Sequence, residues 1–475
     1  MSDPVQVAAE DRLAGLFREY AGTPANSVDA LPGDGSDRRV FRLRSAGGSV
    51  IGIAHADARE NLAFVTFTRH FRAHGLPVPE ILADDLEQGV YLEQDLGSTN
   101  LFAMIESRRS ATGLAPEIVA VYRKAIEWLP VFQAVAGPSL DYSVCYPRAR
   151  FDRQSMAWDL NYFKYHFLKL VKVAFDEQAL ERDFQALIEF LVEADAEYFL
   201  YRDLQSSNIM IVAGEPFFID YQGGRRGALQ YDVASLLYDA KADIGPETRD
   251  ALLDHYLQAV ARHTPVRPDR FRHHYHGFVL IRLMQAMGAF GYRGLFERKR
   301  QFLQSVPYAV KTLESLLSEL ALPVDVPELQ KALRRIVQAA HIREIGATHV
   351  PLTVRISSFS FRDGYPAPST HGGGFVFDCR LLPNPGRFVQ FSQRSGLDPD
   401  VRAWLEREES VHAFMTHVRD LVEQAVETYR QRNFTELSVS FGCTAGRHRS
   451  VFCASLLADF LRRRQVVVDL VHRDL

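Results

Sequence analysis

Hydrophobic and polar positions alternate along most of the first hundred residues, as they do in β-strands. Residues 38–54 alternate charged and apolar side chains on either side of a Gly-Gly turn, which predicts a hairpin. Residues 59–74 instead place their large apolar side chains at helical spacing, and residues 81–93 predict two further strands. We therefore expect a small, strand-rich unit with one helix over about residues 1–97.

The pattern becomes helical from about residue 115 to residue 320, with one interruption. Between Phe199 and Asp220 the sequence becomes loop-like and then shows two short apolar runs joined by Gly214-Glu215. Two strands and a turn inside a helical region are typical of a functional site, because loops on a rigid scaffold often carry the chemistry. The helices are expected at residues 118–131, 162–173 and 184–191.

The sequence changes character after residue 320. Residues 321–350 contain Pro323 and Pro327, a basic amphipathic helix and Gly346, and we interpret them as a linker helix. From residue 351 onward strands alternate with helices, which favours an α/β layer. The strands are expected at residues 352–358, 375–380 and 437–441, and the helices at 410–430 and 449–464.

A chain of 475 residues is too long for one hydrophobic core, so more than one domain is expected. We predict a first domain over residues 1–320, a linker over 321–350 and a second domain over 351–475. The first domain divides into a small lobe, about residues 1–97, and a large lobe, about residues 98–320.

Composition narrows the class of protein. The chain is 47% hydrophobic and 24% charged with a net charge of -4, which excludes a disordered or collagen-like chain and disfavours a general nucleic-acid coat. Its four cysteines are irregularly spaced and predict neither a disulfide framework nor a zinc pattern. The N-terminus lacks the features of a signal peptide, and no stretch of about 18 apolar residues occurs. We therefore expect a cytoplasmic protein without a membrane span.

The interruption in the helical region carries a candidate catalytic site. Phosphoryl transfer needs a carboxylate to orient the acceptor hydroxyl, and an amide with a second carboxylate to hold magnesium. Residues 201–208 match the kinase catalytic loop H-R-D-x-x-x-x-N at Arg202, Asp203 and Asn208. Asp220 ends the second apolar run, where the metal-binding Asp of D-F-G stands in kinases. The alternative is that Asp203 and Asn208 only cap turns and Asp220 only ends a strand.

Residues 1 to about 320 resemble the aminoglycoside phosphotransferase-like (APH) kinases. The closest likeness is to the branch that phosphorylates cell-wall amino sugars, the N-acetylmuramate/N-acetylglucosamine anomeric kinases. This resemblance implies an α+β bilobal protein-kinase-like fold that uses ATP and Mg²⁺. It rests on the stretches Ser36–Leu43, Leu76–Pro79, Glu93–Gly97, Ile219–Gln222 and Tyr231–Leu237.

The resemblance also implies roles for individual residues. Asp203 would be the catalytic base, Asn208 and Asp220 the magnesium ligands, and Asp232 an anchor of the catalytic loop. The cofactor-binding residues would be Gly33, Gly35 and Ser36 in a turn over the phosphates, with Arg38 and, in the hinge segment, Glu93.

The chain departs from the kinase pattern where the ATP-contacting lysine is expected. Residues 50–55 contain no lysine, so Arg38, Arg39 or His55 would have to meet the phosphate charge. The catalytic loop also opens with Tyr201, where kinases usually have His. The alternative function is a non-catalytic regulatory protein, a pseudokinase that binds ligands without chemistry.

The acceptor site is less readable from the sequence. Residues 148–165 mix acidic, basic and aromatic side chains, as a sugar site would. They equally fit an amphipathic helix that packs Trp158, Tyr162 and Tyr165 inward.

A second candidate site follows the strand expected at residues 437–441. Gly442 opens a loop that runs to Ser450, and a helix is expected to begin at about Arg449. Backbone N–H groups and the helix dipole in such a loop attract anions, and Arg447, His448 and Arg449 add cationic donors.

Cys443 opens an alternative for the same loop. With Arg449 and Ser450 it satisfies the cysteine-phosphatase pattern C-x5-R-[ST], in which the thiolate is the nucleophile. The candidate general acids would be Asp398 and Asp400.

Residues 351–475 resemble the C-terminal domain of the RapZ family, bacterial adaptors that sense glucosamine-6-phosphate and present a small regulatory RNA to an endonuclease. The fold implied is a smaller α/β domain of RapZ C-terminal type. The resemblance implies that Thr444, Gly446 and Arg449 would hold a sugar phosphate. The opposite wall would be lined by Asp378, Arg380 and Asn384. The matching stretches are Ser357–Phe361, Gly364–Pro366, Phe377–Pro385, Ser395–Asp398 and Gly442–Val451.

Of the functions that the RapZ resemblance implies, RNA binding has weaker support in the sequence than anion binding has. The Walker-type phosphate loop of the RapZ N-terminal half does not occur in this sequence. Residues 351–475 hold 16 arginines, no lysine and 14 acidic residues, and Arg462–Arg464 is the only basic run. The sequence therefore predicts an ATP-dependent kinase of a sugar or amino-sugar hydroxyl, joined to a domain that binds a phosphosugar or similar anion.

Overall fold

The computed structural model describes residues 4–31, 38–109, 113–319, 322–345, 352–365, 374–431, 434 and 436–475. The chain forms two compact units, Met1–Ala347 and Thr348–Leu475. Each has its own hydrophobic core.

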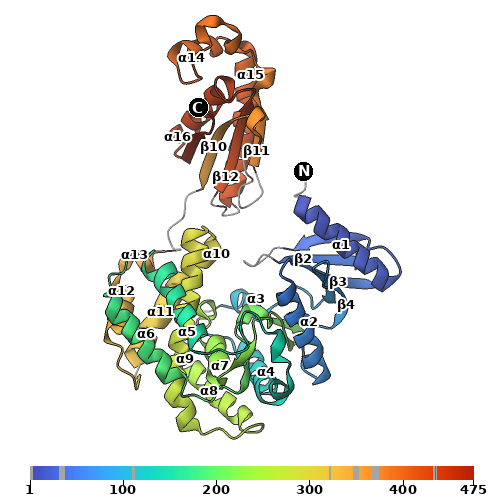
Figure 1. Cartoon of the computed structure of the whole chain (residues 1–475), viewed down its shortest axis with the longest axis vertical. Coiled ribbons are helices and arrows are strands. Elements are labelled where there is room, and N and C mark those ends of the chain that lie inside the picture. The colour runs from blue at the N-terminus through green and yellow to red at the C-terminus, as the bar shows by residue number, and fades with distance from the viewer. Residues whose placement is uncertain are drawn as a thin grey trace. The chain divides into compact units, whose positions relative to one another are not determined.

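The small lobe of the first unit is a five-stranded antiparallel sheet in the order β1-β2-β3-β5-β4 (Figure 1). Helix α1 (Pro4–Ala21) covers one face of this sheet, and α2 (Ala58–Ala73) follows β3 in the chain. The strands are β1 (Ser27–Leu31), β2 (Arg39–Ser45), β3 (Gly48–Ala54), β4 (Ile81–Asp85) and β5 (Val90–Gln94). The predicted hairpin, helix and strand pair are confirmed, whereas α1 and β1 were not predicted.

Side chains alternate between the two faces of β5, so this strand contributes to two hydrophobic cores. Val90 and Leu92 pack with Leu13 and Phe17 of α1, whereas Tyr91 packs in the main core of the first unit. Successive side chains of a strand point to opposite faces, so one face of the sheet is closed by α1 and the other is turned toward the large lobe.

The large lobe is mostly helical. Two small antiparallel sheets of two strands interrupt its helices: β6 (Tyr198–Leu200) pairs with β9 (Arg225–Gly227), and the hairpin β7 (Ile209–Val212) and β8 (Glu215–Phe218) lies between them in the chain. The main helices are α3 (Leu101–Ser107), α4 (Pro116–Pro130), α5 (Arg153–Phe163), α6 (Glu177–Leu191), α7 (Leu229–Leu237), α8 (Pro246–Val260) and α9 (Pro268–Ala289). They are followed by α10 (Arg300–Leu303), α11 (Val306–Glu319), α12 (Pro327–Gln338) and α13 (Ala340–Arg343).

Two expectations for this unit need correction. The helix predicted at 162–173 begins earlier, as α5, and continues as a π-helical segment at Lys164–Leu168. The predicted linker helix is α12, and it belongs to the first unit. Its apolar face, including Leu329, Leu333 and Ile336, is fully buried in the main core of that unit, so the amphipathic pattern reflects packing and not a connection.

The second unit is an α/β layer built on a four-stranded parallel sheet in the order β11-β12-β10-β13. Three of its strands, β10 (Thr353–Ser360), β11 (Gly374–Asp378) and β12 (Glu436–Cys443), were predicted. The fourth, β13 (Val467–His472), was not. Because the strands are parallel, β10, β11 and β12 all end at one edge of the sheet, where Asp378 and Cys443 lie. The helices are α14 (Pro399–Leu405), α15 (Glu409–Gln431) and α16 (Arg449–Arg463).

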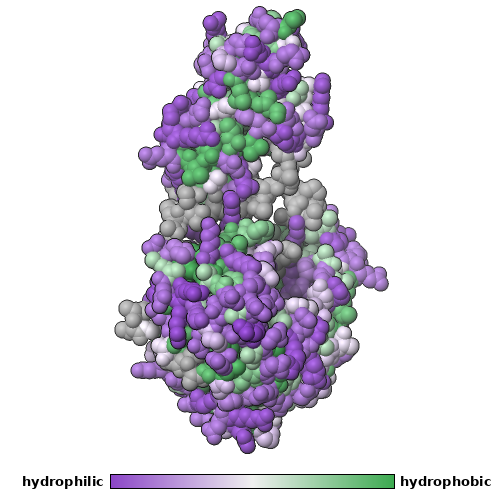
Figure 2. Space-filling model, turned by 60° about the vertical axis from the view of Figure 1, so that its left-hand side comes forward, coloured by the Kyte–Doolittle hydropathy of each residue, from purple (hydrophilic) through white to green (hydrophobic). Residues whose placement is uncertain are grey.

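Within the described ranges, none of the helices combines the length and the apolar composition needed to cross a membrane. The visible face of the first unit is mostly hydrophilic, as expected for a surface exposed to water (Figure 2).

Candidate functional site

A buried carboxylate holds the loop that follows β6. Asp232, in the first turn of α7, accepts hydrogen bonds from the backbone N–H groups of Tyr201 (2.9 Å) and Arg202 (3.1 Å). It also accepts one from the Gln133 side chain at 3.0 Å. Burial raises the pKa of Asp232 to about 7 against these hydrogen bonds. Arg202, the residue before Asp203, takes a left-handed backbone conformation at this point (φ 84°).

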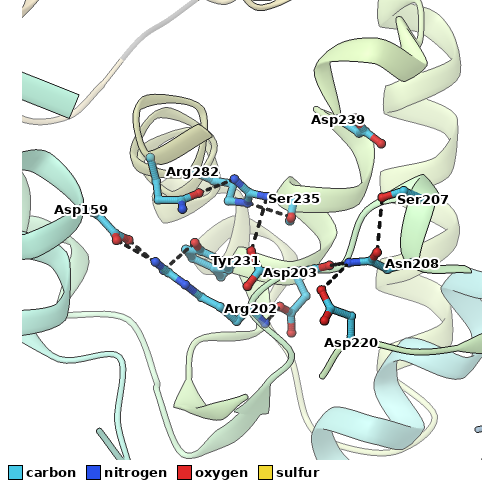
Figure 3. Close-up of polar contacts among 12 residues, drawn as sticks. Asp159, Arg202, Asp203, Ser207, Asn208, Asp220, Tyr231, Ser235, Asp239 and Arg282 are labelled. Carbon is cyan, nitrogen blue, oxygen red and sulfur yellow. Dashed lines mark hydrogen bonds and ion pairs between the residues drawn. The ribbon is translucent and has the colours of Figure 1, made fainter. Parts of the chain in front are cut away.

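Asp203, Asn208 and Asp220 converge on one space (Figure 3). The Asn208 side-chain amide donates to the Asp203 backbone carbonyl at 2.8 Å and to the Asp220 carboxylate at 3.2 Å. The Asp203 and Asp220 side chains remain 37% and 42% exposed, so both carboxylates can reach a ligand. The β7–β8 hairpin brings the two ends of this segment together, because Ile219 N–H also donates to Asn208 O at 3.1 Å.

Arg38 contacts a carboxylate of each lobe. Its Nη1 atom lies 3.2 Å from Asp220 Oδ1, and its Nη2 atom lies 3.4 Å from Glu60 Oε1 on α2. His55, after β3, approaches the same Glu60 with Nδ1 at 3.4 Å from Oε2. Burial lowers the pKa of Arg38, but Tyr91 and the surrounding carboxylates outweigh it and raise that pKa overall. The positive charge that faces Glu60 therefore comes from Arg38, the residue before β2, because β3 contains no charged side chain.

Arg38, Asn208 and Asp220 line a cleft of about 600 Å³ between the two lobes. The small lobe contributes apolar side chains of β2, β3 and β5, and the large lobe contributes residues between Gln205 and Asp220. Glu93 of β5 lies in this cleft, and burial raises its pKa to about 8 despite the opposing charge of Arg38. Of the predicted cofactor-binding residues, Arg38 and Glu93 are brought together here. Gly33, Gly35 and Ser36 lie outside the described residues.

The predicted acceptor segment differs from the expectation of an inward-packed helix. Trp158 and Tyr165 are 46% and 49% exposed, so the expected inward packing of these two rings is wrong. Asp159 of the same helix pairs with both terminal nitrogens of Arg202, at 2.6 and 2.7 Å. Neither Asp159 nor Glu60 was singled out by the sequence, because each is one ordinary charge on an amphipathic helix.

The loop after β12 carries the second site. Cys443 ends the strand, Arg449 begins α16, and the Cys443 thiol lies 3.1 Å from the Ser450 hydroxyl. Burial raises the pKa of the Cys443 thiol. The Ser450 hydroxyl and the backbone N–H groups of Ser450, His448 and Ala445 outweigh that effect and lower the pKa overall. The loop therefore stabilises negative charge at its centre.

Arg449 links this loop to the segment that follows β11. Its Nη1 atom donates to the carbonyls of Arg380 and Leu382, both at 3.0 Å, and the residue is 5% exposed. Its Nη2 atom lies 3.5 Å from the Thr444 hydroxyl. Gly446 turns the loop with φ 65°, and a Cβ atom there would lie 2.9 Å from Asp474, so only glycine fits without strain.

The other residues predicted for the anion site lie near this loop, but they do not all contact it. Asp378 and Arg380 pair with each other at 2.6 Å, and the turn that Asn384 caps lies against His448. His448 itself contacts the Phe391 carbonyl at 3.0 Å, whereas Arg447 is exposed.

The surroundings of Asp398 and Asp400 do not favour the role of general acid. Hydrogen bonds from Ser395 lower the pKa of Asp398 and favour its carboxylate form. Asp400, in the first turn of α14, is 48% exposed and lies 3.8 Å from Arg394.

Comparison with known proteins assigns the first unit to a protein family. Residues 27–268, about half of the chain, match the family model described as "Phosphotransferase enzyme family". The chain belongs to this phosphotransferase family. Its kinase-like bilobal fold is followed by a second unit that matches the RapZ C-terminal domain over residues 352–475.

Relatives of the second unit are bacterial proteins. One is a "nucleotide-binding protein" of Geotalea daltonii, 38% identical over 124 residues, which are 26% of this chain and 42% of that protein. Another is the "RNase adapter protein RapZ" of Serratia proteamaculans, 35% identical over 163 residues, which are 34% of this chain and 55% of that protein. The chain thus spans about half the length of these relatives.

Solved structures similar to the phosphotransferase unit include small-molecule kinases. The amicoumacin kinase hAmiN, in complex with AMP-PNP, Ca²⁺ and amicoumacin, is 13% identical with a TM-score of 0.46, covering 69% of this chain and all of that chain. A choline/ethanolamine kinase family protein from Mesorhizobium loti is 15% identical with a TM-score of 0.45, covering 70% of this chain and 99% of that one. Neither likeness bears on the substrate of this chain.

Proposed function

We propose that the first unit is an ATP-dependent kinase that transfers a phosphoryl group to a hydroxyl of a sugar or amino sugar. The observation that carries this proposal is that Asn208, which contacts both Asp203 and Asp220, lines the interlobe cleft together with Asp220 and Arg38. Phosphoryl transfer depends on positioning and charge neutralisation, and this cluster supplies groups for both.

Asp203 has the exposure and the surroundings of a group that orients the acceptor hydroxyl. It is held at the tip of a loop whose backbone N–H groups are bound by Asp232, so its direction is constrained while its carboxylate stays accessible. Arg38 is the group we assign to the phosphate charge, in place of the usual lysine. Glu60 and Asp220 hold its guanidinium from two sides, as the lysine of a kinase is held by the glutamate of its helix.

Asn208 and Asp220 fit a magnesium ion. Their side chains lie 3.2 Å apart, and Mg²⁺ in such enzymes is bound through one or two protein oxygens and the substrate phosphates. In the described part of the chain, no group of three or more His, Cys, Asp or Glu side chains is placed to hold a metal without further ligands. Bound there, the ion would neutralise the phosphate charge that develops during transfer.

The acceptor class comes from the sequence resemblance to amino-sugar kinases and from the second unit. That unit resembles the C-terminal domain of proteins that sense glucosamine-6-phosphate, and we propose that its Cys443–Ser450 loop binds a phosphosugar or similar anion. A kinase and a phosphosugar-binding domain in one chain would join the synthesis of a phosphosugar to its sensing.

The test is a phosphorylation screen of a metabolite library with Mg-ATP, followed by mass spectrometry. A mass gain of one phosphoryl group on a sugar or amino sugar is the expected result. ATP binding without turnover of any acceptor would instead favour the non-catalytic, ligand-binding alternative.

A second candidate function for the loop is a cysteine phosphatase, favoured by the lowered pKa of the Cys443 thiol and by its contact with Ser450. Release of inorganic phosphate from sugar phosphates would support it if Cys443→Ser abolished the activity. A parent protein with no such activity removes this candidate.

A further inference from the structure

The large lobe contains a second pocket, of about 320 Å³, and none of the described residues lines both this pocket and the interlobe cleft. Its walls come from the segment before α5, the first turn of α5, the C-terminal end of α6, β9 and α9. Protein interiors contain few voids larger than a water molecule, whereas small-molecule sites measure about 300–1,000 Å³. A pocket of this size is therefore a candidate binding site.

The interior of this pocket is apolar. The buried side chains that line it are those of Phe151, Met156, Leu191, Ala228 and Phe278. An apolar cavity of about 150 Å³ is large enough to admit benzene. The pocket in the large lobe is larger than this, so it has room for one ring or branched chain with a short substituent.

The charged side chains that line the pocket are mostly arginines. They are Arg150, Arg153 and Arg226, and Asp152 is the one carboxylate that lines it among the described residues. Asp152 already has partners, because its carboxylate accepts hydrogen bonds from Arg148 and from a backbone N–H in the first turn of α5. The charges that a ligand would meet therefore favour an anion over a cation.

Two of these arginines share one carboxylate. Arg150 donates to Glu197 with both terminal nitrogens, at 2.6 and 3.0 Å, whereas Arg226 lies 3.4 Å from the same carboxylate. Arg153 has a separate partner, Glu189. The Arg226 side chain is 27% exposed, so a ligand can reach it. A second anion beside Arg226 would give its guanidinium a partner that it does not have to share.

Phe151 connects this pocket to the catalytic loop. Its ring packs edge-on against the Tyr231 ring, with 4.8 Å between the centroids, and the Arg202 guanidinium lies 5.1 Å from the Phe151 ring centroid. Arg202 also donates to the Tyr231 hydroxyl at 2.7 Å, and it immediately precedes Asp203 (Figure 3). A molecule in the pocket would therefore contact the ring against which this arginine lies, without entering the cleft.

We propose that this pocket binds a small organic anion, a carboxylate carried on one ring or on a branched apolar chain, at a site separate from the catalytic cleft. The buried side chains would surround the apolar part of the ligand, and Arg226 would bind its carboxylate through charge-assisted hydrogen bonds. Such binding does not depend on the proposed kinase reaction, because it can be measured without phosphoryl transfer.

The experiment compares two probes that share a ring and differ in charge, para-fluorophenylacetate and the neutral para-fluorophenylethanol. Fluorine NMR titration measures their binding to the full chain, with and without saturating Mg-AMP-PNP. The variants are Arg226→Gln, Ala196→Phe, which fills the pocket at a residue that lines it, and Arg182→Gln. The last is the matched control, since Arg182 is exposed on α6 and does not line the pocket among the described residues.

The parent is expected to bind the acid about 10-fold more tightly than the alcohol, the scale of one hydrogen bond to a charged group. Arg226→Gln should remove this difference by weakening the binding of the acid alone. Ala196→Phe should remove the binding of both probes, and Arg182→Gln should bind them as the parent does. Mg-AMP-PNP should leave the binding of the acid unchanged.

Four results would overturn the proposal: no binding of the acid, equal binding of the acid and the alcohol, unchanged binding in Ala196→Phe, or displacement of the acid by Mg-AMP-PNP. If Arg226→Gln does not fold, as judged by circular dichroism, Arg150→Gln takes its place. Arg150 is exposed, and its loss leaves Glu197 to Arg226, so the acid should again lose its advantage over the alcohol. An acid that keeps its full advantage in that variant overturns the assignment.

Discussion

Arg38 of the small lobe lies 3.2 Å from Asp220 of the large lobe, and this ion pair joins the two walls of the cleft where a kinase would hold its nucleotide phosphates. The partner of Arg38 on its own lobe is Glu60, at 3.4 Å. A cation held between two carboxylates keeps its position before a ligand arrives, which is the arrangement expected of a preorganised phosphate contact.

Removal of the Arg38 charge should therefore weaken nucleotide binding. We expect Arg38→Met to lower the affinity for Mg-ATP about 10-fold or more, and Arg38→Lys to lose less, because lysine keeps the charge without the planar fork. Calorimetry with Mg-AMP-PNP measures the effect. The control is Arg44→Gln, further along β2, whose side chain is 53% exposed and pairs with Asp29. Equal affinity in the parent and Arg38→Met would show that Arg38 does not contact the phosphates.

Asp203→Asn should abolish most phosphoryl transfer while leaving the fold intact. The Asp203 carboxylate is exposed and the loop is held by Asp232 through backbone groups, so the amide can replace the acid without disturbing the loop. A loss of about 100-fold or more in kcat is expected for a group that assists proton transfer. Rates measured on an acceptor from the library screen test it, with the exposed Asp250→Asn as control. A variant as active as the parent would exclude Asp203 from catalysis.

Glu93 should make the stability of the first unit depend on pH. Burial raises its pKa from 4.5 to about 8, so the folded state binds this proton more tightly than the unfolded state does. The contribution of Glu93 is complete below about pH 4.5 and is lost as the pH rises toward 8, at about 1.4 kcal/mol per pKa unit.

Urea unfolding of the parent and Glu93→Gln at pH 5 and pH 8 measures this effect. Relative to Glu93→Gln, which has no such proton, the parent should be less stable at pH 8 than at pH 5. The variant Glu215→Gln, at a 58% exposed position, should show the same pH dependence as the parent. A pH-independent difference between the parent and Glu93→Gln would contradict the raised pKa.

The loop after β12 should bind a phosphosugar without a covalent step. Arg447 is exposed at this loop, and its side chain donates to no residue that the structure describes, so Arg447→Gln should weaken binding of glucosamine-6-phosphate about 10-fold without changing the thermal stability. Cys443→Ser should retain the binding, because its hydroxyl can accept the same backbone hydrogen bonds. Calorimetric titration measures both, with the exposed Arg463→Gln of α16 as control. Loss of binding in Cys443→Ser alone would point instead to the thiolate.

The sequence alone located the centre of the first site, for a local reason. Asp203, Asn208 and Asp220 belong to one loop and hairpin, so their spacing reflects a geometry built from neighbouring residues. The strand, loop and helix around Cys443 are equally local, as are most of the helices and strands, because their apolar periodicity is imposed by the face that each one buries.

The tertiary structure decided which charges surround that centre. Glu60 and Asp159 come from two separate elements, and each is a common residue type with no local signal of its role. It also decided that α12 belongs to the first unit, since an amphipathic helix does not specify which core will cover its apolar face. Periodicity and spacing follow from local backbone geometry, whereas the balance of charge at a site depends on side chains that only folding brings together.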